Sequence, residues 1–85
     1  MTASTLLGNF LRHLRVERGL SLNTATSYGY QLKGYIKFIE GRGQNPAAAR
    51  RDDVLAYLEG KKTQGLKSAS LFAAAISIRQ FHRFL

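Results

Sequence analysis

The spacing of the apolar residues constrains this sequence more than any other feature. Along most of the chain, leucine, isoleucine, phenylalanine and alanine recur at steps of three and four, and a strict step of two is nowhere sustained. Steps of three and four place side chains on one face of an α-helix, whereas a half-buried strand needs alternation. The sequence therefore predicts an all-α fold, a single bundle of four to five helices.

The first two predicted helices are bounded by capping residues and glycine. The first is expected over residues 4–17, with Ser4 or Thr5 as its cap and with Gly19 closing it in the left-handed conformation. The second begins near residues 21–23 and ends at about Ile39. Its expected inward residues are Ala25, Tyr28, Leu32, Tyr35, Ile36 and Ile39.

The third predicted helix follows the breaker-rich stretch 41–46, which is the longest expected loop. Asp52 or Asp53 is its expected cap, and the glycine-bounded segment 60–65 ends it. Its apolar face is expected to consist of Val54, Leu55, Tyr57 and Leu58.

The fourth predicted helix starts at Ser68 or Ser70 and stays in phase to the last residue, which suggests a chain cut from something longer. Phe72 and Ile76 stand off its buried stripe, so they fit either an interface or a wide core. The expected inward residues are Leu71, Ala74, Ala75, Ile78, Phe81 and Leu85.

Composition limits the size and the partners of this fold. The 85 residues fit one domain, and 45% of them are hydrophobic, as in ordinary globular proteins. Lysine and arginine number 13 against 5 acidic residues, which gives a formal charge of +8. An anionic partner is therefore expected, and nucleic acid, an acidic membrane surface and an acidic protein all satisfy the charge alone.

Several classes of site are not expected. The chain has no cysteine and only two histidines, so we expect neither a metal site nor a cofactor. It lacks an apolar run of the roughly 18 residues that span a bilayer and a signal-peptide pattern, so a cytoplasmic location is expected. There is no phosphate loop, no paired-carboxylate site and no nucleophile beside a base, so catalysis is not expected.

The polar face of the second predicted helix suits contact with phosphate. Hydroxyl and amide groups donate to phosphate oxygens, a helix N-terminus adds oriented amides, and lysines release counterions. An ordinary solvated face with cap residues explains the pattern equally well. The face consists of Asn23, Thr26, Ser27, Tyr30, Lys33 and Lys37.

The entry to the fourth predicted helix repeats this combination of base and hydroxyl. Two helix entries facing the same way would form a cradle for a DNA backbone, although solubilising loop lysines are the simpler explanation. The residues are Lys61, Lys62, Lys67, Ser68 and Ser70, with Arg79 and Arg83 further along.

His82 and three tyrosines lie on apolar stripes, where packed structural roles are the better interpretation. These tyrosines are Tyr28, Tyr35 and Tyr57. Tyr30 projects instead from the polar side of its helix.

The order of several short motifs resembles the N-terminal core-binding domain of tyrosine recombinases, the phage-integrase group. The motifs are Phe10-Leu11 leading to ERGLS at 17–21, Asn23-Thr24, Ser27-Tyr28 with Leu32, Asp53-Val54, Tyr57-Leu58, and SIRQFHRFL at 77–85. No motif is specific alone, because each is also common in helices and at their ends. The resemblance depends on their joint order and covers essentially the whole chain.

This resemblance implies a SAM-like helical bundle over residues 1–85 that covers one face of a recombination half-site. A separate C-terminal catalytic domain would grip the other face, so the family's arginine, His-x-x-Arg and tyrosine nucleophile are not expected here. Expected partners are double-stranded DNA, that catalytic domain and other protomers of a recombination tetramer, toward which Arg12 and Arg15 of the first helix would lie.

In the family, the second and fourth helices lie toward the major groove. Together with the charge pattern, this placement gives the expected DNA-binding residues Asn23, Thr24, Ser27, Tyr30, Gln31, Lys33, Lys67, Ser68, Ser70, Ser77 and Arg79. The stretch 70–75 departs from the family, because relatives often carry arginine there.

The resulting hypothesis is DNA binding at a recombination core site, positioning duplex DNA for integration or strand exchange. The alternative is a protein-interaction module in which Phe72, Ile76 and the basic surface dock an acidic partner.

Overall fold

A computed structural model describes residues 2–85 of the chain. Over that range the structure is helical and contains no strand, which confirms the all-α prediction. Its elements, in chain order, are α1 (Ala3–Val16), α2 (Leu22–Gly41), the 3-10 turn η1 (Pro46–Ala48), α3 (Arg51–Thr63) and α4 (Ser68–Phe84).

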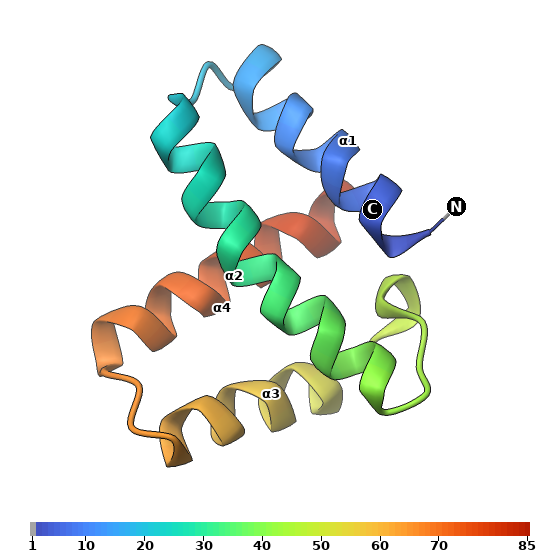
Figure 1. Cartoon of the computed structure of the whole chain (residues 1–85), viewed down its shortest axis with the longest axis vertical. Helices are drawn as coiled ribbons and strands as arrows, with labels where there is room; N and C mark the ends of the chain where they lie inside the picture. The colour runs from blue at the N-terminus through green and yellow to red at the C-terminus, as the bar shows by residue number, and fades with distance from the viewer. Residues whose placement is uncertain (1) are drawn as a thin grey trace.

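The helices surround α2, which crosses the middle of a flat molecule of 35 × 29 × 16 Å (Figure 1). Helix α1 packs along the first half of α2, α4 crosses α2, and α3 packs against α4 and the second half of α2. The N-terminal ends of α2 and α4 lie on the same side of the molecule, at the left of Figure 1. The two helix entries that the sequence singled out therefore share one side.

Aromatic side chains join the four helices in one core. Phe10 of α1 meets Phe81 of α4 edge-on, with ring centroids 5.5 Å apart, and Tyr35 of α2 meets Tyr57 of α3 at the same distance. The Tyr35 hydroxyl is hydrogen-bonded to His82 Nε2 of α4 at 2.7 Å. The structural roles expected for Tyr35, Tyr57 and His82 are confirmed.

Local sequence was sufficient to predict the end of the first helix but not its N-terminal cap. Gly19 ends the first helical segment with φ 65°, as predicted. The cap of α1 is Thr2 rather than Ser4 or Thr5, because the Thr2 hydroxyl accepts the Thr5 amide at 3.1 Å.

The third helix begins earlier than predicted. Arg50 is its cap residue, and Asp53 acts from inside the first turn, where its Oδ2 accepts the Arg50 amide at 2.9 Å. The capping carboxylate was therefore foreseen, but its position was not. The helix also continues to Thr63, well into the segment that was expected to end it.

Two apolar residues expected inside are exposed over nearly half of their surface. Leu55 is 46% exposed and Leu85 is 43% exposed, because α3 is covered on one side only and Leu85 follows the last helical turn. The departure of Phe72 and Ile76 from the buried stripe is confirmed, since their exposed fractions are 69% and 36%. Within residues 2–85, no helix combines the length and hydrophobicity that crossing a membrane requires.

Candidate nucleic-acid interface

The first turn of α2 carries hydroxyl groups that are already partly ordered. The Ser21 hydroxyl accepts the Thr24 amide at 3.2 Å and donates to Thr24 Oγ1 at 3.0 Å. Thr24 therefore keeps its own hydroxyl proton free to donate outward. Asn23 and Ser27 are exposed beside it on the same helix.

A groove of about 520 Å³ lies where α2, α3 and α4 meet. Lys33 and Lys37 of α2 stand one helical turn apart on one wall, and Lys61 of α3 lies on another. Among the described residues that line it, none is acidic, so the groove is a site of concentrated positive charge. It is lined by Tyr30, Gln31, Lys33, Gly34, Lys37, Tyr57, Lys61, Leu66, Ser70 and Ala74.

Tyr57 builds the floor of this groove and holds α3 close to α2. Its ring packs against Phe38 at 5.4 Å as well as against Tyr35, and a Cβ on Gly34 would lie 3.0 Å from its hydroxyl. Glycine at position 34 therefore allows the approach. Burial, and then the neighbouring Tyr30, raise the pKa of Tyr57, so its phenol is neutral at physiological pH.

Tyr57 also positions one of the cations. The Lys61 ammonium lies over its ring, 5.6 Å from the centroid, at a distance where a cation is attracted to an aromatic face. Lys61 is half-buried by this contact, whereas Lys33 and Lys37 are exposed. Lys33 and Lys37 also border a neighbouring groove between α1 and α2 that Glu40 lines, but among the described residues no ion pair joins either lysine to Glu40.

A second, smaller hollow continues the surface between α2 and α4. Ser27 and Gln31 of α2 face Ala73 and Ile76 of α4 across it, and Gln31 belongs to both hollows. At the near end of α4, Lys67 and Ser68 are exposed.

The structure brings together most of the residues expected at DNA. Tyr30, Gln31, Lys33 and Ser70 line one groove. The remaining members on this side are exposed on α2 or at the start of α4, and they are Asn23, Thr24, Ser27, Lys67 and Ser68.

Two expected residues do not join the lysine groove. Ser77 lines the hollow between α2 and α4, but it is only 2% exposed and its hydroxyl donates to the carbonyls of Ala73 and Ala74 at 3.1 and 2.9 Å, so the structure does not support its inclusion at the DNA surface. Arg79 is exposed, but it lines a separate pocket with Arg50, and that pocket shares no lining residue with the lysine groove. Helical periodicity predicts which residues of α4 share a face. It does not predict which helices pack against that face, and this packing decides whether the face is exposed to solvent.

Lys37 and Lys61 are outside the expected DNA-binding set, although the sequence places Lys37 on the polar face of the second helix and Lys61 before the fourth. The spacing of four residues between Lys33 and Lys37 already stacks the two on one face. The place of Lys61 beside them depends on how α3 packs against α2.

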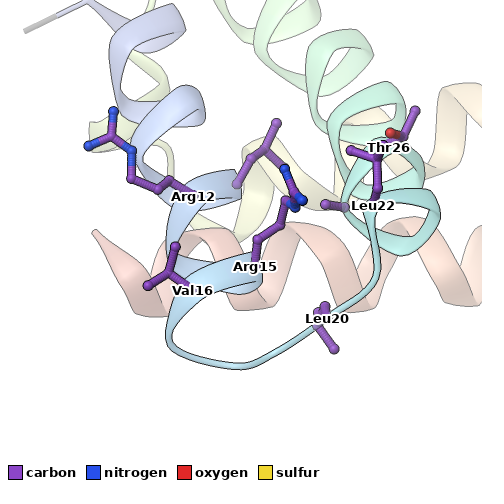
Figure 2. A pocket seen from close by; sticks show the side chains of 8 residues that line it. Arg12, Arg15, Val16, Leu20, Leu22 and Thr26 are labelled. Carbon is purple, nitrogen blue, oxygen red and sulfur yellow. The ribbon is translucent and has the colours of Figure 1, made fainter.

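The arginines expected to face a neighbouring protomer lie near a third hollow, between the end of α1 and the start of α2. Figure 2 shows Arg15 extending toward α2 and Arg12 extending from α1 on the side away from it. The same hollow carries two exposed apolar side chains, Val16 at 71% and Leu22 at 60%.

Comparison with known proteins agrees with this architecture. Residues 7–85 match the family model described as phage integrase, N-terminal SAM-like domain. The tyrosine recombinase XerD of Halalkalibacterium halodurans is 42% identical over 86 residues, which cover 99% of this chain and 29% of that protein.

Other relatives give the same picture. XerD of Agrobacterium fabrum is 38% identical, with 93% of this chain and 24% of that protein covered. A putative tyrosine recombinase of Caldanaerobacter subterraneus is 30% identical, with 98% and 29% covered. This chain thus spans less than a third of the length of these relatives. No solved structure matches it. The chain belongs to the phage integrase N-terminal SAM-like domain family.

Proposed function

We propose that this domain binds duplex DNA across the surface formed by α2, the start of α4 and the lysine groove between α2, α3 and α4. The observation that carries this proposal is the convergence of Lys33, Lys37 and Lys61, from two helices, on one groove that is lined by no acidic side chain of the described residues. Lysines that neutralise phosphates in such a groove release counterions condensed on the DNA, which is a large favourable term at low salt.

Hydroxyl and amide groups around the lysines set the position of the DNA backbone. Tyr30, which is 80% exposed, and Ser70 stand at the groove, and Ser27 lies one turn earlier on α2. Such groups donate hydrogen bonds to phosphate oxygens and fix the register of a protein on a duplex. The N-terminal ends of α2 and α4, on one side of the molecule (Figure 1), add oriented amides that attract anions.

The kinship with tyrosine recombinases supports a role for this binding in DNA recombination. In our proposal the domain holds a recombination core site, and a separate catalytic domain cuts and rejoins the DNA. This chain then contributes affinity and placement rather than a reacting group. In the same proposal, Arg12, Arg15 and the apolar residues that line the hollow with them face another protomer of the assembled complex.

Salt dependence of DNA binding tests the proposal directly. A fluorescein-labelled 30-base-pair duplex is titrated with the 85-residue chain at several salt concentrations, and the slope of log affinity against log salt is measured. Each lysine that neutralises a phosphate contributes about 0.9 to that slope. Lys33→Ala, Lys37→Ala and Lys61→Ala should each lower it by about that amount.

Lys62→Ala is the matched control, because Lys62 is an exposed neighbour of Lys61 that does not line the groove. It should leave the slope nearly unchanged. A slope near zero in the unaltered chain, or an equal loss with Lys62→Ala, would contradict the proposal.

One observation favours a second candidate, a protein-docking module. Phe72 is an aromatic side chain with 69% of its surface exposed, on the same helix as Ile76. Phe72→Ser should leave DNA affinity unchanged if Phe72 belongs to a protein-docking face that lies outside the DNA surface. A loss of DNA binding with that variant would instead tie Phe72 to the DNA surface.

A further inference from the structure

Four arginines surround another pocket, here called the arginine pocket, which lies between the start of α3 and the second half of α4. Arg50 and Arg51 come from the α3 end, and Arg79 and Arg83 stand one turn apart on α4. The pocket has a volume of about 450 Å³, and all four arginines are exposed. Nothing in the DNA proposal uses them.

The floor of this arginine pocket is apolar. Val54 and Ala75 are half-buried there, and Ile78 is 1% exposed. Apart from the arginines and His82, the described residues that line the pocket carry no polar side chain. This differs from the lysine groove, where Tyr30, Gln31 and Ser70 offer hydroxyl and amide groups.

Within residues 2–85, no carboxylate forms an ion pair with the arginines of the pocket. Across residues 2–85, the one ion pair joins Arg42 to Asp53 at 3.7 Å. Asp53, in the first turn of α3, is buried. One of its carboxylate oxygens lies near Arg42, and the other accepts the Arg50 backbone amide. Its two oxygens are thus committed to the helix cap and to Arg42. Asp52 is exposed and does not line the pocket.

Arginine suits a partner with planar or multidentate oxygens. Its planar guanidinium forms two parallel hydrogen bonds to one carboxylate or phosphate, which lysine cannot do, so the floor of the pocket decides between the two. Binding is favoured when an apolar side chain of the partner is buried against the aliphatic floor. A sugar–phosphate backbone has no such side chain. The pairing of guanidinium rim and aliphatic floor matches a peptide in which acidic residues flank an apolar one.

We propose that the arginine pocket is a docking site for an acidic protein segment, with carboxylates on Arg79 and Arg83 and an aliphatic side chain against Val54 and Ile78. The site is independent of DNA binding, because it shares no lining residue with the lysine groove. Either proposal can therefore fail without the other.

The test uses fluorescein-labelled synthetic peptides and the 85-residue chain. The probe peptide carries glutamates on both sides of a leucine. One control peptide replaces the glutamates with glutamine, and a second replaces the leucine with serine. Polarisation should give measurable affinity for the probe, strong weakening with the glutamine peptide, and weakening with the serine peptide.

Protein variants locate the site. Arg79→Ala combined with Arg83→Ala should weaken probe binding about tenfold, because two charge-assisted contacts are lost. Arg18→Ala combined with Lys62→Ala removes the same charge from exposed positions outside the pocket and should change binding less than about twofold. Circular dichroism checks that both variants remain helical.

Three outcomes would overturn the proposal. One is equal weakening by the two double variants, which would mean that net charge alone attracts the probe. Another is equal affinity for the leucine and serine peptides, which would leave the floor without a role. The last is loss of duplex DNA binding, by about tenfold, in the Arg79→Ala and Arg83→Ala double variant, which would assign the pocket to nucleic acid.

Discussion

Tyr35 and His82 form a part-buried polar contact at the edge of the core, where their hydrogen bond joins α2 to α4. Burial, and then the negative charge of Asp53, raise the pKa of Tyr35 to about 12. Burial lowers the pKa of His82 below its ordinary 6.5. Both side chains are therefore neutral in the folded protein at neutral pH, and the folded state resists protonation of His82.

This resistance makes stability depend on pH. Below pH 6.5, the ordinary pKa of histidine, the unfolded chain binds a proton at His82 that the folded chain does not, so the free energy of unfolding falls as pH falls. His82 thus contributes its full stability above that pH and loses it progressively toward its lowered folded pKa. Urea unfolding should show a lower midpoint at about pH 5 than at about pH 7.5.

The variant His82→Gln isolates this effect, because glutamine keeps a hydrogen-bonding side chain and does not titrate. The difference between the two midpoints should shrink in that variant. An unchanged difference would mean that other groups cause the pH dependence.

Gly34 offers a second test at the scale of single residues. Alanine is favoured over glycine inside a helix by about 1 kcal/mol, but a methyl group here would press on the Tyr57 hydroxyl. Gly34→Ala should therefore gain little stability in the unaltered chain and about 0.5–1 kcal/mol in a Tyr57→Phe background. A thermal-unfolding double-mutant cycle measures the difference. Equal gains in both backgrounds would show that Tyr57 does not press on position 34.

Ser27 tests the proposed DNA surface with one charge. Ser27→Glu places a carboxylate on the exposed face of α2, where we expect a phosphate, so DNA affinity should fall about tenfold or more at low salt. Gln44→Glu adds the same charge in an exposed loop and serves as control. Anisotropy with a labelled duplex measures both. Retained affinity in Ser27→Glu would remove this face of α2 from the interface.

At the scale of elements, the helices follow from apolar spacing and breakers, whereas the caps depend on geometry that spacing does not contain. Ser4, Thr5 and Thr2 are chemically similar, and only the turn of the backbone decides which hydroxyl meets a free amide. Leu55 belongs to the predicted apolar face of the third helix, but apolar spacing does not say how wide a stripe the neighbouring helices cover. In the folded protein its neighbours cover a narrower stripe around Tyr57.

Asp53 shows how one side chain can define a helix start. It is 6% exposed, accepts the Arg50 amide and lies near Arg42. Asp53→Ala should lower the free energy of unfolding by about 1–3 kcal/mol, since a buried amide loses its partner. Asp52→Ala is the matched control on the same turn and should cost only a few tenths of a kcal/mol, because Asp52 is exposed and acts mainly through the helix dipole. Equal losses in the two variants, measured by urea unfolding, would contradict this account.

At the scale of the whole molecule, the sequence predicted a cationic, hydroxyl-bearing surface but not which of its residues lie together in one groove. Lys33, Tyr30 and Ser70 were named from helical faces, and their meeting in one groove follows from the crossing of α2 and α4. Lys61 lies in the same groove because its ammonium packs over Tyr57. Arg79 lies outside the groove because it faces the start of α3. Long-range packing therefore divides the basic residues into two separate sites.

Backbone amide mapping by NMR, with the 85-residue chain and an unlabelled DNA duplex at low salt, tests this division and the DNA-binding role most directly. We expect the largest shifts at Ser27, Tyr30, Lys33, Lys61 and Ser70, and small shifts around Arg50 and Arg83. Shifts confined to Phe72 and Ile76, shifts centred on the arginine pocket, or no shifts at all would contradict the account.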